Sequence, residues 1–243
     1  MIELSFNQVD YILFTNIIFL RYVCIFYYIY MTPEIEDGIS KGRIIALTDG
    51  IFAIVMTILV LEIVVPHLSH SEASTLLLKY LIGLWPLFLS YITSFIILGF
   101  FWIGHDEQFH YIKRVNKTLL WISIFYLMFI ALIPFSTSLL GEYIDQQISV
   151  LIYGINLIIA LSLNYLHWRY ATINHRLVDS DLDPVFITVV AKMHLIGIIL
   201  FMIAIVVSFA NINASLVLFL FVPLYNFVLI KKHKRWFWFT NKR

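Results

Sequence analysis

An arginine and an aspartate stand at the entrance of a strongly apolar stretch of the chain. The stretch reads RIIALTDGIFAIVMTILVLEIVVP and begins at Arg43, and Asp49 lies only six residues further on. Ionisable side chains at membrane depth usually pair or face a protein interior, and they mark function. Two kinds of chemistry are therefore open to this pair: direct binding of an ion, or an anchor that joins neighbouring helices.

The rest of the sequence offers no convergent set of catalytic groups. GxSxG, HExxH, P-loop and GxGxxG motifs are absent, and no Ser-His-Asp order stands out. The densest polar cluster, HDEQFH at 105–110, is interpreted as a solvated turn, because histidines five residues apart do not share a helical face well. The single cysteine, Cys24, excludes an intrachain disulfide and a cysteine-based metal site. We predict a protein that is not an enzyme, with no cofactor and no metal site.

Composition indicates an integral membrane protein of the all-α class. The chain is 61% hydrophobic and 13% charged, whereas soluble domains are roughly 45–50% apolar and about 25% charged. A span needs about 20 mostly apolar residues, and the runs here are continuous rather than alternating as in a β-barrel. Six transmembrane helices are expected, at residues 44–65, 81–103, 118–140, 148–168, 189–210 and 214–230.

The distribution of lysine and arginine sets the orientation, because these residues mark cytoplasmic loops. With the N-terminus inside, the cytoplasmic side holds the basic residues before the first span, those at the second and fourth connections, and those of the tail KKHKRWFWFTNKR, while the other side holds Lys79. Ahead of the tail, these residues are Lys41, Arg43, Lys113, Arg114, Lys117, Arg169, Arg176 and Lys192. Both termini are therefore expected in the cytoplasm. The net charge of +1 gives no general attraction to nucleic acid.

Three parts are expected along the chain. Residues 1–40 form an N-terminal extension, 41–232 the six-helix domain, and 233–243 a basic cytoplasmic tail. The extension contains YILFTNIIFLRYVCIFYYIY at 11–30, with Arg21 at its centre. Three interpretations stay open for it: a seventh helix, an interfacial segment, or translated upstream sequence ahead of a start at Met31.

One side of the first expected helix carries a narrow stripe of three residues. At about 100° per residue, Ile54, Thr57 and Leu61 fall near 140°, 80° and 120° from Asp49. They lie one above the other, and Asp49 points away from them. On periodicity alone, the stripe packs against a neighbouring helix and the Thr57 hydroxyl bonds back to a backbone carbonyl.

The acidic side chain near the inner end needs hydrogen-bond donors. Arg43 can extend to the interface, and Asp49 lies about one and a half turns deeper. Trp102 and His105 at the end of the second span, and Asn116 before the third, are expected at the same level. We predict a structural network there that holds the first helix in position. Its members are Arg43, Thr48, Asp49, Trp102, His105 and Asn116.

These stretches resemble the endolysosomal potassium channel family, transmembrane protein 175, and its prokaryotic relatives. The first resembles the family's signature of Arg, three residues and Phe-Ser-Asp, although Leu47-Thr48-Asp49 stands here and Thr48 keeps the hydroxyl. WPLFLSYITSFIILGFFWIGHDEQF resembles the second helix, which ends in Trp-x-x-His, and LLWISIFYLMFIALIPFSTSLLGEY the third. The resemblance covers about residues 40–232.

The resemblance implies a potassium-selective cation channel of the cell membrane. One six-helix repeat per chain implies a homotetramer in membrane lipid, with the first helix of each subunit lining a central pore for potassium ions. The family's constriction falls on Ile54, its pore threonine on Thr57 and its next apolar layer on Leu61, which is the stripe that periodicity selects. The alternatives are a secondary transporter, for which inverted repeats are lacking, and a non-conducting membrane assembly protein.

Overall fold

A computed structural model describes residues 40–64, 68, 70–223 and 225 of the chain. The described part is helical, with one isolated β-bridge between Ile112 and Val178. The elements are α2 (Lys41–Ile58) with a 3-10 turn η1 (Leu59–Glu62), α3 (His70–Gly83), α4 (Trp85–Tyr111), α5 (Lys117–Ala131), α6 (Ile133–Glu142), α7 (Gln147–Thr172) with η2 (Ile173–His175), and α8 (Pro184–Ser208). A shorter apolar helix, Ile212–Pro223, follows.

Five helical segments of the described chain are long and apolar enough to cross a membrane. They are Lys41–Glu62, Trp85–Tyr111, Lys117–Glu142, Gln147–His175 and Pro184–Ser208. The all-α membrane class predicted from composition is therefore confirmed. The sixth span, expected at 214–230, coincides with the helix Ile212–Pro223 at its start, and most of its remainder lies outside the described residues. Six helices per chain thus stays a prediction, as do the extension before Ser40 and the tail 233–243, which lie outside the description.

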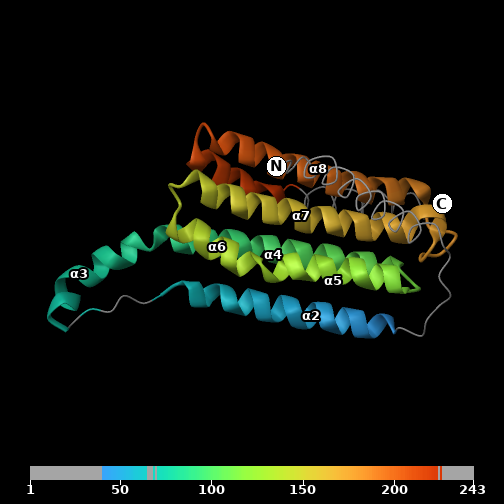
Figure 1. Ribbon diagram of the computed structural model, residues 1–243, viewed down its shortest axis with the longest axis horizontal. Helices are drawn as coiled ribbons and strands as arrows, with labels where there is room; N and C mark the ends of the chain where they lie inside the picture. Colours follow the sequence, from blue (N-terminus) through green and yellow to red (C-terminus); the bar gives the residue numbers. More distant parts are fainter. Residues whose placement is uncertain (1–39, 65–67, 69, 224, 226–243) are drawn as a thin grey trace, which may run out of the picture.

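Two of the expected spans have different limits because of proline. The second was expected from residue 81, but α3 ends at Gly83 and α4 begins afresh at Trp85, with Pro86 in its first turn. The third divides at Leu132 into α5 and α6, because Pro134 cannot donate the backbone hydrogen bond of a continuous helix. Proline is tolerated in the first helical turn, where its missing N–H costs nothing. In Figure 1, α3 projects away from the other helices.

The interpretation of HDEQFH as a solvated turn is wrong. Helix α4 continues to Tyr111, and His105, Gln108 and Phe109 are buried. His105 and Gln108 face other helices, whereas Asp106 and His110 are exposed on the helix surface, and the turn itself comes later, at 112–116.

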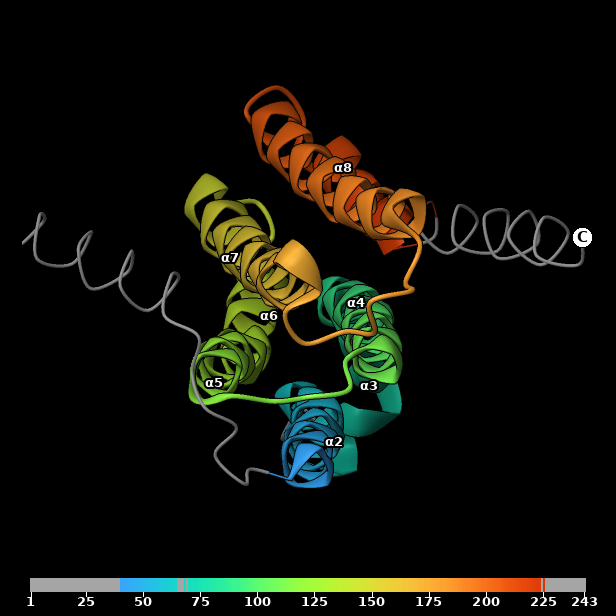
Figure 2. The same ribbon diagram turned by 90° about the vertical axis from the view of Figure 1, so that its right-hand side faces the viewer.

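The long helices lie side by side, with α2 along one side of the molecule and α8 on the opposite side (Figures 1 and 2). Helix α2 packs on α4, α5 and α6, and η1 packs on α4 and α6. The contacts are made through Phe52 and Val55 of α2 and Leu59 of η1, which are at most 4% exposed. The apolar core continues from there through α4, α5 and α7 to α8. This arrangement leaves one long face of α2 uncovered by the other described helices.

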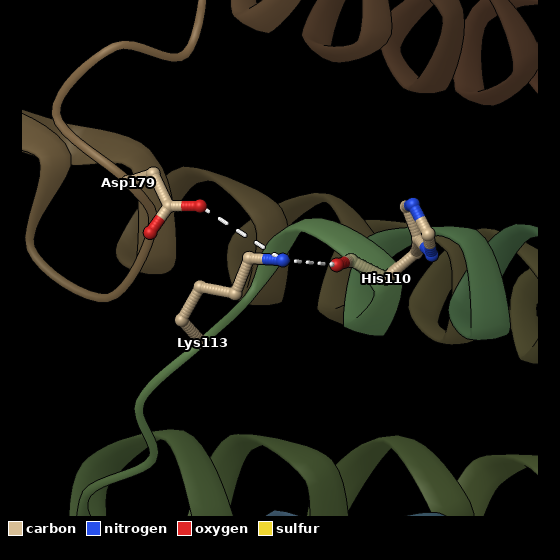
Figure 3. A network of polar contacts seen from close by, with 3 residues as sticks. All are labelled: His110, Lys113 and Asp179. Carbon is tan, nitrogen blue, oxygen red and sulfur yellow. Dashed lines mark hydrogen bonds and ion pairs between the residues drawn. The ribbon is translucent and has the colours of Figure 1, made fainter.

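Two connections bind each other beside the C-terminal ends of α4 and α7. The backbone N–H groups of Lys113 and Arg114 donate to the carbonyl of Leu177 across 2.8 and 3.2 Å. The Lys113 ammonium lies 3.8 Å from the Asp179 carboxylate and 3.4 Å from the His110 carbonyl (Figure 3). Because the two connections share these bonds, the ends of α4 and α7 are held in register.

Candidate functional site

The stripe selected by periodicity lies on the uncovered face of α2 and continues onto η1, where Leu61 lies. Ile54 is 59% exposed and Leu61 is 72% exposed, and Thr57 between them is exposed as well. An apolar face this open within one chain requires another apolar surface, lipid or a further copy of the protein, to cover it. The opposite face of the same helix carries Phe52 and Val55 into the core. One face of α2 therefore packs in the core of the chain, and the other is open to a further surface.

The Thr57 hydroxyl bonds back to its own helix. Its Oγ1 lies 2.9 Å from the Ala53 carbonyl and 2.8 Å from the Ile54 carbonyl, so its single hydrogen is directed to the backbone. A hydroxyl oxygen also has two acceptor lone pairs, and here the hydrogen is already engaged. The exposed oxygen is therefore oriented as an acceptor, which is the role required of a cation ligand.

The Asp49 carboxylate accepts a hydrogen bond from Trp102. The indole Nε1 of Trp102 on α4 donates to Oδ1 of Asp49 across 2.9 Å. Both side chains lie at the exposed border of the α2–α4 contact. Of the three donors considered for Asp49 from the sequence, Trp102 makes the bond, so the acidic group ties α2 to α4.

Thr48 and His105 lie beside this bond. Both are buried, at 3% and 1% exposure. Together with Asp49, Trp102 and Asp106 they line a small cavity between α2 and α4, and among the described residues Thr48 Oγ1 and His105 Nε2 have no hydrogen-bond partner. The Thr48 hydroxyl thus stands next to the anchor without joining it.

The His105 ring is held by aromatic packing. It stacks on Tyr126 of α5, with centroids 5.0 Å apart and planes at 14°, and it lies 4.9 Å from the rings of Phe109 and His167. His105 therefore acts as a core aromatic side chain that joins α4 to α5 and α7.

Asn116 and Arg43 take no part in the bond to Asp49. The Asn116 carbonyl oxygen accepts from the backbone N–H of Leu119 at 3.0 Å and caps α5, while its amide nitrogen donates to the Tyr170 hydroxyl at 2.8 Å. Arg43 is exposed at the start of α2. The expected inner network therefore divides in two: an α2–α4 bond, and a separate α5–α7 bond.

A second buried polar network was missed from the sequence. Gln108 on α4 contacts Asn164 and His167 on α7 and His194 on α8. Asn164, His167 and His194 interrupt otherwise apolar helices, and that interruption was the available signal. Among the described residues, no group of three or more His, Cys, Asp or Glu side chains is placed to hold a metal ion.

Comparison with known proteins identifies the family that this chain resembles. Residues 43–134 match the family model described as endosomal/lysosomal potassium channel TMEM175. A potassium channel from Chamaesiphon minutus is 33% identical over 187 residues, covering 75% of this chain and 91% of the relative. A potassium channel from Streptomyces collinus is 31% identical over 150 residues, covering 59% and 70%.

A solved structure agrees with this fold. The crystal structure of a lysosomal potassium-selective channel TMEM175 homolog from Chamaesiphon minutus superposes with a TM-score of 0.68 at 27% identity. The match covers 77% of this chain and 96% of that one.

Proposed function

Because the chain belongs to the TMEM175 family, we propose that it is a potassium-selective channel whose pore is lined by α2. The relatives named above are potassium channels. The family consists of ion channels rather than enzymes. Potassium is accordingly the permeant ion, and no cofactor is required for permeation.

The observation that carries the pore assignment is the uncovered stripe of α2. Ile54 and Leu61 are large, apolar and exposed, and they lie on a segment whose other side packs into the core through Phe52, Val55 and Leu59. Several copies of α2 that face one another would bury these side chains against each other. A homotetramer, with four Ile54 side chains at a hydrophobic constriction and four Leu61 side chains as the next layer, satisfies this requirement.

Selectivity in this proposal comes from partial dehydration. A ring of Ile54 side chains narrows the path and removes hydration water, and it gates by dewetting. Thr57 lies next to that ring with its oxygen oriented as an acceptor, and it replaces part of the lost hydration. The exchange favours potassium, the more weakly hydrated ion, over sodium.

Asp49 on α2 has a structural role in this proposal. Asp49 is bonded to Trp102 and is not an ion ligand in this proposal. The bond fixes the rotation of α2 about its own axis, and so keeps the stripe on the pore side. The protein resides in the cell membrane with both termini in the cytoplasm, as the positions of lysine and arginine indicate.

A flux assay on the full chain in liposomes tests the proposal. Purified protein in potassium-loaded vesicles is expected to pass potassium down its gradient, without any coupled ion and without saturation typical of a carrier. Flux that requires a second ion gradient would identify a transporter, and absence of flux would identify a non-conducting assembly protein. Either outcome overturns the channel.

A further inference from the structure

The uncovered face of α2 extends from the stripe back to the first turn of the helix. Arg43 lies eleven residues before Ile54, and eleven residues make about three turns, so the two positions share a face within about 20°. Leu47 and Gly50 lie between them on that face, Leu47 with 45% of its side chain exposed and Gly50 exposed as well. Arg43 itself is exposed. One row of uncovered residues therefore runs from Arg43 to Leu61.

The opposite face of α2 is buried over the same length. Its buried residues are Ile44, Thr48, Phe52 and Val55, none of them more than 4% exposed. Their spacings of four, four and three residues are those of one side of a helix, and this side packs on α4 and α5. Because Arg43 lies on the other side, its side chain leaves the helix away from the core of its own chain.

Arg43 brings a full positive charge to this face. Among the described residues, no carboxylate lies within 4 Å of its guanidinium. Asp49, the acidic residue of α2, points to another side of the helix and accepts a hydrogen bond from Trp102 across 2.9 Å. A guanidinium stays protonated at every physiological pH. The charge of Arg43 is therefore permanent, and no described carboxylate neutralises it.

In the proposed channel, on which this inference rests, the uncovered face of α2 lines the pore. Arg43 then stands about 16 Å before Ile54 along the helix axis, at the mouth of the pore where α2 begins. Four copies of the chain place four positive charges around that mouth. Charges of the same sign repel each other, and at about 0.1 M salt the repulsion extends over about 10 Å. A potassium ion that enters at this end therefore meets a ring of repelling charge.

We propose that Arg43 limits the entry of potassium at this end of the pore. The ring lowers the local concentration of cations at the mouth and leaves the constriction at Ile54 as it is. Potassium and sodium carry the same charge, so the ring changes the size of the current and not the preference for potassium. Potassium passes less readily from the Arg43 end than from the Leu61 end, because the ring lies at one end only.

Single-channel currents of the full chain in symmetric potassium chloride test the effect of the charge. In the wild type at about 0.1 M salt, currents at equal and opposite voltages should differ in size. Arg43→Gln should raise the smaller current at least about twofold, and Arg43→Glu should raise it further. At about 1 M salt these differences should shrink, because the Debye length falls to about 3 Å. The permeability ratio of potassium to sodium should stay the same in every variant.

Two control variants separate the charge of Arg43 from its shape and from the charge of the whole protein. Arg43→Lys keeps the charge and should conduct like the wild type. Lys192→Gln removes the same charge from an exposed position on α8, on the opposite side of the molecule from α2 (Figures 1 and 2), and should leave the current unchanged. Equal currents of the wild type and Arg43→Gln at about 0.1 M salt, or an equal gain in Lys192→Gln, would overturn the proposal.

A distance measurement tests the position of Arg43 without any current. In a Cys24→Ser background, which removes the single cysteine of the chain, spin labels are attached to Arg43→Cys or to Lys192→Cys, and pulsed EPR in nanodiscs measures the distances between copies. The label at position 43 should give the shorter distance, with a second distance about 1.4 times longer, as expected of four copies in a square.

The two measurements distinguish the failure of this inference from the failure of the channel. A longer distance at position 43 than at position 192 would place Arg43 away from the axis and reject the ring. A conducting wild type whose current does not depend on Arg43 would overturn the ring alone, whereas a wild type that passes no current would overturn the proposed function and the ring together.

Discussion

The Trp102 indole donates a hydrogen bond to the Asp49 carboxylate across 2.9 Å, and so joins α4 to α2. Asp49 lies in the middle of α2 and Trp102 in the second half of α4. The proposed pore residues lie further along α2, on a face turned away from this bond. The position of the stripe therefore depends on a contact that is outside the stripe itself.

Replacing Trp102 by Phe should destabilise the protein by about 1 kcal/mol. A hydrogen bond to a charged group contributes about 1.5–3 kcal/mol, but both side chains are partly exposed, so solvent offsets part of the loss. Thermal unfolding of the detergent-solubilised protein measures the effect. Trp121→Phe, at a 59% exposed tryptophan, is the control and should change the free energy of unfolding by less than about 0.5 kcal/mol. An equal effect of both variants would show that the bond to Asp49 contributes nothing.

Replacing Ile54 by Asn should increase conductance and reduce the preference for potassium over sodium. The polar side chain wets the constriction and removes the dewetting barrier. Single-channel recording in planar bilayers measures both quantities. Val55→Ala, on the buried face of the same helix, should leave the permeability ratio unchanged. A current unaltered by Ile54→Asn would contradict the assignment of the constriction.

Thr57→Val should reduce selectivity while keeping the shape of the side chain. Valine lacks the exposed oxygen that the back-bonded hydroxyl offers to a cation. A loss of about 1 kcal/mol in the relative stabilisation of potassium over sodium is about a five-fold change in permeability ratio. Reversal potentials under bi-ionic conditions measure that ratio. Thr57→Ser keeps the oxygen and should retain most of the selectivity; if serine and valine behave alike, the oxygen is not a ligand.

Gly141→Ala should destabilise the contact between α4 and α6. A Cβ at this position would lie 2.6 Å from Ser90 Oγ and 3.1 Å from the Leu87 Cα, and a backbone atom cannot move aside cheaply. Overpacking of this kind typically costs about 1–3 kcal/mol. Chemical denaturation in detergent measures the loss. Gly99→Ala meets nothing within 4 Å and should be neutral or stabilising by up to about 1 kcal/mol, since alanine favours a helix. Similar behaviour of the two variants would rule out a close approach at Gly141.

The sequence by itself determined the membrane class, the two faces of α2 and the family. Composition decides the class because a chain that is 61% hydrophobic has too little polar surface for water. Helical period decides which residues share a face, so Ile54, Thr57 and Leu61 could be grouped before any contact was known. The depth of a residue in the membrane follows from its position along a span. This depth made Trp102 one of the candidate hydrogen-bond donors to Asp49.

Only the tertiary structure decided which donor meets Asp49 and what surrounds the polar residues. Asn116 pairs with Tyr170, fifty-four positions along the chain, and not with Asp49. His105 lies among aromatic rings, although its sequence neighbours suggest a wet turn. These features depend on the distances and rotations between helices, which are set by the packing of many side chains that are far apart in the sequence. A local sequence pattern therefore cannot predict them.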